Sequence, residues 1–254
     1  METPCAGRGR DETLAIRELC KGLLVIRALI LDFDGLILDT ETPFRDSWCE
    51  IYADAGMSVS NEIWAGLLGA EADPPGAYLL LEQHLGHPID RDALRKRRFA
   101  REQELLRHEV AMDGVVLLLS EARRRGLSLA VASSSDRTWV EGHLRRIELY
   151  DRFQAIVTAN DVSRTKPSPE LYRHALRVLD VSPRDAIAFE DSLHGVRAAK
   201  SAGLFAVAVP NRVTRHLPMN EADLVVGSIA EKTLDEYITC ALASLGDAGS
   251  CGVS

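Results

Sequence analysis

The sequence predicts an α/β fold: a doubly wound parallel sheet of Rossmann-like type, with an all-helical cap domain inserted after the first strand. Three observations indicate this fold. Short apolar runs alternate with amphipathic stretches over residues 112–240, which is typical of a parallel sheet with helices on both faces. Residues 41–111 have helical patterning and no convincing strand. An earlier apolar strand ends directly in two carboxylates, Asp32 and Asp34.

The first predicted strand runs into the sequence Leu29-Ile-Leu-Asp-Phe-Asp-Gly35. Because residues i and i+2 of an extended chain point to the same face, Asp32 and Asp34 can reach one small volume. Two like charges held so close are unfavourable unless a cation or a shared proton relieves them. Gly35 lets the chain turn sharply or approach a ligand closely. The pattern therefore predicts a divalent metal and a carboxylate that attacks phosphorus, with solvated acids at a strand end as the alternative.

The segment between residues 41 and 111 is predicted to form the inserted helical cap. Glycine and proline residues separate its four helical patterns. These patterns cover Pro43–Ala55, Asn61–Leu68, Gly76–Leu85 and Asp90–His108. Two crossings, near Asp39–Thr42 and Val110–Gly114, join the cap to the sheet domain. A cap joined in this way can hinge over a site, exclude water and select the substrate.

Alternating strands and helices follow the insert. The further strands are predicted at Leu127–Ala132, Ala155–Thr158, Ala186–Phe189 and Phe205–Val209, with a weaker apolar run at Leu224–Val226. The helices are predicted at Val115–Arg125, Thr138–Leu149, Pro169–Leu179 and Leu193–Ala202. The domain boundaries follow from these elements. Residues 25–40 and 112–240 form the core, 41–111 the cap, 1–24 an N-terminal extension and 241–254 a flexible polar tail.

Composition and charge argue against several classes of function. The chain has 254 residues, of which 46% are hydrophobic and 27% charged, as in an ordinary globular protein. Its net charge of -8 argues against nucleic acid or an anionic membrane as a partner. Neither a membrane span nor a signal peptide is predicted, and the mixed-charge stretch Arg91–Arg107 reads as a solvated helix face. Five scattered cysteines without a CxxC pair suit a reducing cytoplasm and give no zinc site.

Polar residues follow four of the predicted strands, at the edge where open α/β sheets bind ligands. In chain order they are Asp32 and Asp34, Ser133-Ser134-Ser135, Lys166 before Pro167, and Glu190-Asp191. Four separate connections thus deliver acids, hydroxyls and a lysine to one rim of the sheet. Each piece alone is a weak signal, and their joint placement is a strong one.

The order and spacing of these residues resemble the haloacid dehalogenase (HAD) superfamily, in its phosphatase branch with a helical cap after the first motif. The four motifs are DFDG (Asp32–Gly35), SSS (Ser133–Ser135), Lys166, and Glu190-Asp191. The resemblance covers residues from about Val25 to Tyr237. It implies a phosphoric monoester hydrolase that needs magnesium (Mg2+) and works through an aspartyl-phosphate.

The resemblance also implies a role for each motif residue. Asp32 is the nucleophile, and Asp34 is the general acid and base. Ser133 binds the phosphoryl group, and Lys166 bridges the nucleophile and the phosphate. The implied metal ligands are Asp32, Asp191 and the backbone carbonyl of Asp34. Glu190 either orients Asp191, holds a metal-bound water or simply ends its strand.

Elementary chemistry supports these roles. A phosphate monoester carries roughly -1.5 to -2 charges at neutral pH, so it does not approach bare carboxylates without a cation. Magnesium takes oxygen ligands and is commonly held by one or two carboxylates together with phosphate. The ammonium of Lys166 adds a compact positive charge for the transferring group. The hydroxyl of Ser133 and the amide of Ser134 are further donors for phosphate oxygens.

Two alternatives to a phosphatase stay open. The β-phosphoglucomutases share the motifs and the cap, but they carry a histidine where this chain has Phe44 and an arginine where it has Ala72. A mutase stabilises a bisphosphate intermediate, so the missing cationic partners favour a phosphatase. A non-catalytic scaffold or regulatory protein of the same fold is the second alternative. The expected partner is a small phosphorylated metabolite, similar to a sugar phosphate.

A few other residues carry weaker expectations. Thr40 either caps the first cap helix or, with Asp39, borders the site on the hinge side. His194 is expected to be exposed or partly packed rather than catalytic. The three tryptophans are expected in the core rather than on a stacking platform; they are Trp48, Trp64 and Trp139.

Overall fold

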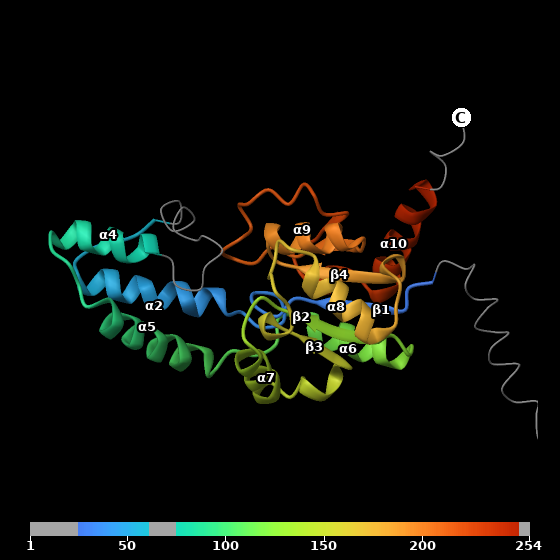
Figure 1. The fold of residues 1–254 in the computed structure, drawn as a ribbon, viewed down its shortest axis with the longest axis horizontal. Helices are drawn as coiled ribbons and strands as arrows, with labels where there is room; N and C mark the ends of the chain where they lie inside the picture. The colour runs from blue at the N-terminus through green and yellow to red at the C-terminus, as the bar shows by residue number, and fades with distance from the viewer. Residues whose placement is uncertain (1–24, 61–74, 249–254) are drawn as a thin grey trace, which may run out of the picture.

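The computed structural model describes residues 25–60 and 75–248. Figure 1 shows an elongated molecule with a lobe of helices at one end and a sheet flanked by helices at the other. The N-terminal extension, the predicted helix at 61–68, Trp64 and Ala72 lie outside the described residues. No helix in the described part of the chain is long and apolar enough to cross a lipid bilayer.

The core domain is built on six parallel strands in the order β3-β2-β1-β4-β5-β6. The strands are β1 (Ala28–Leu31), β2 (Ser128–Ala132), β3 (Ala155–Val157), β4 (Ala186–Glu190), β5 (Phe205–Ala208) and β6 (Leu224–Val225). Leu31 at the end of β1 pairs with Val131 of β2 and Phe189 of β4. The carboxyl ends of these central strands are therefore level, and the strand order reverses between β1 and β4. Such a reversal is where doubly wound sheets bind their ligands.

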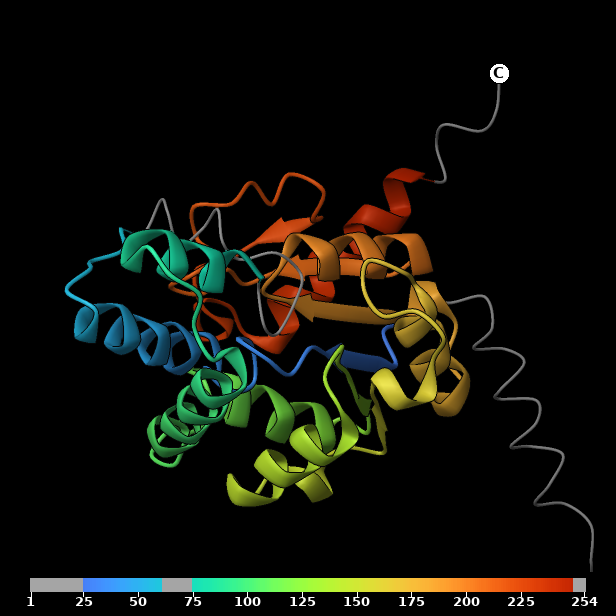
Figure 2. The same ribbon diagram turned by 60° about the vertical axis from the view of Figure 1, so that its left-hand side comes forward.

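Helices cover both faces of the sheet, as Figure 2 shows. They are α6 (Val115–Arg124), α7 (Arg137–Arg146), α8 (Glu170–Leu179), α9 (Leu193–Ala202) and α10 (Leu234–Ala248), with short 3-10 turns η2 (Tyr150–Arg152), η3 (Ala159–Asp161), η4 (Pro183–Asp185) and η5 (Ile229–Glu231). Alternate residues of each strand point to opposite faces. Leu29 and Leu31 accordingly pack in the cluster with α6, α7 and α10, whereas Ala28 and Ile30 pack in the cluster with α8 and α9. The predicted doubly wound fold is confirmed.

The cap consists of α2 (Glu41–Asp54), α4 (Pro75–Leu85) and α5 (Arg91–Leu106) within the described residues. It has its own apolar cluster, whose largest side chains are Trp48, Tyr52 and Tyr78. The ring of Trp48 stacks on Tyr52 with centroids 5.7 Å apart and meets Tyr78 edge-on at 4.9 Å. Val213, from the loop after β5 of the core domain, belongs to the same cluster. The cap is thus packed against the core and not only tethered to it.

Two expectations differ from the structure, and for Thr40 one of the two alternatives is not observed. The domain boundary predicted at residue 240 lies inside α10, so the helix continues into the segment predicted as a flexible tail. The helix continues there because Tyr237 and Ala241 are buried in the apolar cluster on one face of the sheet. Thr40 makes no capping bond with its side chain; instead Asp39 Oδ1 accepts the N–H of Thr42 at 2.9 Å. The stretch Arg91–Arg107 is only partly a solvated face, because Arg98 and Glu102 within it are buried.

The basic residues of α5 mostly form ion pairs with acids of the cap. Arg101 pairs with Glu50 of α2, with an Nε–Oε2 distance of 2.8 Å, at the surface. Arg98, in contrast, is 5% exposed and pairs with Glu102 at 2.7 Å. A charge placed on the inner side of an amphipathic helix needs such a partner. The sequence pattern alone did not show which arginine faces inward.

Candidate active site

Side chains from the ends of β1 and β4 meet the lysine that follows β3. Lys166 Nζ lies 2.6 Å from Asp32 Oδ1 and 2.6 Å from Glu190 Oε1. The side chains of Asp32, Lys166 and Glu190 are 9%, 5% and 0% exposed, so this ion-pair group is shielded from water. Asp191 completes a group of three carboxylates, with Asp32 and Glu190, whose ligand atoms lie within 4.8 Å of one another. The structure thus brings together residues that are about 160 positions apart in the chain.

The electrostatics of this group follow from its burial. Burial raises the pKa of Asp32 and of Glu190, and the ammonium of Lys166 opposes both shifts. Burial also raises the pKa of Asp191, and the neighbouring charges of Asp32 and Glu190 add to that shift. Burial acts to lower the pKa of Lys166, but the two carboxylates beside it outweigh burial and raise that pKa. Three buried acids therefore share one lysine, which leaves an excess of negative charge.

Asp34 points into a different environment from Asp32. Its Oδ2 accepts hydrogen bonds from Ser135 Oγ at 2.7 Å and Ser133 Oγ at 3.2 Å. Its Oδ1 accepts one from the indole Nε1 of Trp139 at 2.8 Å. Trp139, expected in the core, is half-buried and contacts the proposed acid and base directly, because α7 begins just after the serine run and turns this side chain toward β1. Trp139 packs against the main apolar cluster, as expected, and its hydrogen bond to Asp34 was not foreseen.

The serine run is placed as its position after β2 predicted. Ser133 is fully buried, and its Oγ accepts the backbone N–H of Ser135 at 3.0 Å. Ser134 is exposed and makes none of the hydrogen bonds found in the described site. The carboxylate of Asp34 is absent from the group of three described acids, so its expected share in metal binding stays with its backbone carbonyl. These roles in binding stay predictions.

Two residues that surround Glu190 were missed by sequence analysis, one that bonds it and one that leaves room for it. The hydroxyl of Tyr172, on α8, donates a hydrogen bond to Glu190 Oε1. A Cβ at Gly195, in the first turns of α9, would overlap the carboxylate of Glu190. Tyr172 lies on the apolar face of an amphipathic helix, where a tyrosine gives no local sign that its hydroxyl reaches a buried acid.

Gly35 allows the first motif to lie against Asp191. Its φ of 70° is in the left-handed region, and a Cβ there would overlap Asp191 Oδ2 and Asn211 Nδ2. Asn211 is the third residue that sequence analysis missed, although it follows β5 at the same edge of the sheet. It is 7% exposed, and its Nδ2 donates to Asp191 Oδ2 at 2.7 Å.

The acidic group fits a hard divalent cation. All of its donors are oxygens, as Mg2+ prefers, and they are buried and close together. The excess negative charge gives a physical reason for a cation at this place, since burial disfavours the ionised form of each acid. Asp32, Asp191 and Glu190 are the side chains that could hold it.

Helix α2 of the cap contributes a carboxylate, Glu41, and an aromatic ring, Phe44. Glu41 lies in the first turn of α2, and burial together with the charges of Asp34, Asp39 and Asp32 raises its pKa to about 7. Phe44 is covered by the guanidinium of Arg98, which lies 4.5 Å from the centre of its ring. The position at which a mutase carries a histidine is therefore occupied here by an aromatic ring stacked on an arginine.

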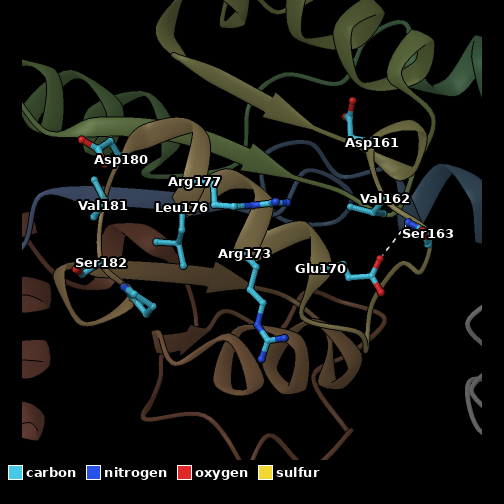
Figure 3. Close-up of a pocket in the computed structure, with 11 residues that line it drawn as sticks. Asp161, Val162, Ser163, Glu170, Arg173, Leu176, Arg177, Asp180, Val181 and Ser182 are labelled. Atoms are coloured by element: carbon cyan, nitrogen blue, oxygen red, sulfur yellow. Dashed lines mark hydrogen bonds between the residues drawn. The ribbon is translucent and has the colours of Figure 1, made fainter.

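A separate hollow of about 960 Å³ runs along α8 and the loop before it (Figure 3). Arg177 and Glu170 are among its lining residues, and Glu170 Oε2 accepts the backbone N–H of Ser163 at 3.0 Å. The residues that line this hollow include no motif side chain. His194, on α9, is exposed, as expected.

The family of this chain follows from its similarity to known proteins. The sequence profile of the haloacid dehalogenase-like hydrolases matches residues 29–209, which include all four motifs. The chain belongs to this family. This confirms the expected HAD-like phosphoric monoester hydrolase of the phosphatase and β-phosphoglucomutase branch.

Relatives of this HAD hydrolase include phosphatases and mutases. The candidate phosphatase YhcW of Bacillus subtilis (strain 168) is 44% identical over 83% of this chain and 95% of its own length. The β-phosphoglucomutase of the same organism is 30% identical over 83% of this chain and 93% of its own. A crystal structure of a CbbY mutant from Rhodobacter sphaeroides in complex with xylulose-(1,5)bisphosphate is 32% identical, with a TM-score of 0.64, and covers 82% of this chain and 96% of that one.

Proposed function

We propose that this HAD hydrolase is a magnesium-dependent phosphatase that hydrolyses a small phosphorylated metabolite, similar to a sugar phosphate, through an aspartyl-phosphate. One observation carries the proposal. Two carboxylates from one motif, Asp32 and Asp34, lie in different environments, the first beside a lysine and two acids and the second among neutral donors. Pairs of acids placed in unlike surroundings are the arrangement that divides nucleophile from proton carrier.

Asp32 is the attacking group in this proposal. Lys166 Nζ and the backbone N–H of Phe33 both contact Asp32 Oδ1, at 2.6 Å and 2.7 Å. These contacts fix the carboxylate and leave Oδ2 as the oxygen that attacks phosphorus. The bond between phosphorus and the ester oxygen breaks as the aspartyl-phosphate forms. Lys166 remains beside the transferring group and stabilises its negative charge.

Asp34 moves the protons. It protonates the leaving ester oxygen in the first step and takes a proton from the water that hydrolyses the aspartyl-phosphate in the second. The hydroxyls of Ser133 and Ser135 can each donate or accept a hydrogen bond, so they can contact this carboxyl group in both of its protonation states. The indole of Trp139 can only donate, and it therefore fixes the orientation of the ionised form.

Magnesium, held by Asp32, Asp191 and the backbone carbonyl of Asp34, would neutralise the phosphate and the acids together. Glu190 is bonded to Lys166 and Tyr172, so we assign it to positioning the lysine rather than to direct ligation. The buried acidic group supports the choice of a divalent cation. Cys49 and Cys240, the cysteines within the described residues, are unpaired. Unpaired cysteines fit a cytoplasmic enzyme, and that location is part of the proposal.

Phosphatase activity is favoured over mutase activity by Phe44. Its ring lies under the guanidinium of Arg98, which is itself paired with Glu102. A mutase needs cationic groups in the cap for a second phosphate, and this arginine is already neutralised by a buried partner. The bisphosphate seen with CbbY belongs to that protein, and for this chain the substrate class is limited to a small phosphate monoester.

The experiment is a phosphate-release assay on p-nitrophenyl phosphate and a panel of sugar phosphates, with and without Mg2+. We expect release that requires Mg2+ and is lost in Asp32→Asn. Asp151→Asn is the matched control, because this exposed aspartate lies in the turn η2. Interconversion of glucose 1-phosphate and glucose 6-phosphate would favour the mutase. Absence of turnover across the panel, equal in wild type and Asp32→Asn, would favour a scaffold.

A further inference from the structure

The loop that follows β5 links the cap to the acidic group. This loop, residues 209–216, is orange-red in Figure 1 and runs from the sheet toward the cap helices. One of its side chains, Asn211, contacts Asp191, and another, Val213, lies in the apolar cluster of the cap. The inference below rests on the proposed function, since it takes Asp191 as a ligand of Mg2+.

Asn211 bonds the acid on one side and the first motif on the other. Its Nδ2 lies 2.7 Å from Asp191 Oδ2 and 3.4 Å from the carbonyl oxygen of Gly35. It is 7% exposed, and Asp191 is 4% exposed, so water does not compete for this bond. A buried donor on one carboxylate oxygen sets the rotation of the carboxylate and leaves the other oxygen for a cation.

The orientation of this amide group is determined by the loop itself. Asn211 Oδ1 accepts the backbone N–H groups of Val213 at 2.8 Å and Thr214 at 3.1 Å. Only the oxygen of an amide side chain can accept hydrogen bonds, so the NH2 group must face Asp191. The N–H of Asn211 in turn donates to Thr214 Oγ1 at 3.0 Å. The loop therefore has the correct shape only while residues 213 and 214 stay in place.

Val213 is what holds that part of the loop in place. It is 5% exposed and packs with Trp48, Tyr52 and Tyr78 of the cap. If the cap moves off the core, Val213 loses this packing, and the two N–H groups that fix Asn211 lose their anchor. Three contacts connect the cap to the acid. Val213 packs in the cap cluster, its backbone N–H donates to Asn211 Oδ1, and Asn211 Nδ2 donates to Asp191 Oδ2.

We propose that Asn211 is a positioning residue for the metal ligand Asp191, and that docking of the cap through Val213 holds it in position. The affinity for Mg2+ then depends on the state of the cap, even with no substrate bound. An opened cap releases the loop and weakens the metal site, while a docked cap sets Asp191 for binding. By linkage, Mg2+ favours the docked cap to the same extent.

The test is isothermal titration of Mg2+ into the full-length protein without substrate. We expect Asn211→Ala to weaken Mg2+ binding by about 10- to 100-fold, the usual effect of removing a residue that orients a metal ligand. Val213→Ala keeps Asn211 but removes two methyl groups from the cap cluster, and we expect at least a threefold weakening, on the order of 0.7 kcal/mol of coupling. A purely structural role would lower the melting temperature and leave the dissociation constant unchanged.

Two matched controls separate these effects from general damage. Asn160→Ala removes another asparagine whose Oδ1 caps a backbone N–H, that of Arg137 at 2.8 Å, away from Asp191. Val181→Ala shortens a valine packed on the opposite cluster, under α8 and α9. Both are expected to bind Mg2+ within twofold of wild type.

Each outcome decides something. If wild type binds Mg2+ and Asn211→Ala binds it equally well, the positioning role is wrong. If Asn211→Ala does not fold, Val213→Ala decides, and an unchanged dissociation constant there overturns the link to the cap. If wild type itself binds no Mg2+, the proposed metal site fails and the inference fails with it, a result distinct from the first two.

Discussion

Asp32 and Asp34 are two residues apart and belong to one motif, yet the structure gives them different neighbours. Asp32 shares a buried space with an ammonium and two further acids. Asp34 receives three hydrogen bonds from uncharged donors, two hydroxyls and an indole. The i and i+2 spacing places both acids at the same edge of the sheet. The segments that follow other strands then give each acid different contacts, and these contacts distinguish the roles proposed for Asp32 and Asp34.

The largest effect is expected for Asp32→Asn. The substitution keeps the volume of the side chain and removes the attacking oxygen, so kcat should fall by about 10⁴-fold or more while the protein stays folded. Single-turnover phosphate release and the far-UV circular dichroism spectrum check both parts. Residual activity within tenfold of wild type would show that Asp32 is not the nucleophile.

The next effect is on stability, at Lys166. Lys166→Met leaves Asp32 and Glu190 buried without their cation, and removing one partner of a buried ion pair costs about 3–5 kcal/mol. Urea unfolding with EDTA present measures this cost. Adding Glu190→Gln to Lys166→Met should recover part of the loss, because one of the two unpaired charges is removed. A double variant less stable than Lys166→Met would contradict the ion-pair account.

On the Asp34 side the expected effect is smaller. Trp139→Phe removes the Nε1 donor and keeps an aromatic ring, and we expect kcat at saturating Mg2+ to fall about tenfold, the equivalent of one hydrogen bond to a charged group. Trp48→Phe is the matched change, because Trp48 Nε1 is buried without a hydrogen-bond partner in the described structure. It should lower the melting temperature and keep kcat within about threefold. Equal kcat values for the two variants would remove the role of the indole.

The smallest effect concerns the cap carboxylate Glu41. Burial and nearby acids raise its pKa to about 7, so the folded state holds this proton more tightly than the unfolded state does. Stability from this group is present below its ordinary pKa and is lost as pH rises toward about 7. Glu41→Gln should therefore be close to wild type in stability at pH 4.5 and more stable than wild type at pH 8, in EDTA. Thermal melts at both pH values check the sign, and a variant that gains nothing at pH 8 would refute it.

Much of the fold was predictable because a parallel strand that is buried on both faces is a continuous run of apolar residues in the sequence. The run that became β4 was predicted to end at Phe189 and ends at Glu190, one residue later. Helix α10 was not among the predicted helices, and the predicted boundary at residue 240 lies inside it. Thr40 was a candidate cap, but Asp39 reaches the free N–H group instead.

The motif residues were predictable for a related reason. Asp32, Ser133 and Asp191 follow strands immediately, so their place at one edge of the sheet follows from the parallel topology. Asn211 carries the same signal, since it follows β5, and attention to that strand end could have found it. Tyr172 carries no such signal, because its hydroxyl reaches Glu190 from within a helix.

The sequence by itself determined the doubly wound sheet, the inserted cap, and the edge at which Asp32, Asp34, Ser133, Lys166 and Asp191 gather, because these depend on local periodicity and chain order. Only the tertiary structure decided which neighbours each acid has. Contacts such as Trp139 with Asp34 and Asn211 with Asp191 depend on how a helix or loop is oriented when it packs. That orientation is set by the sum of many distant contacts and leaves no local pattern in the chain.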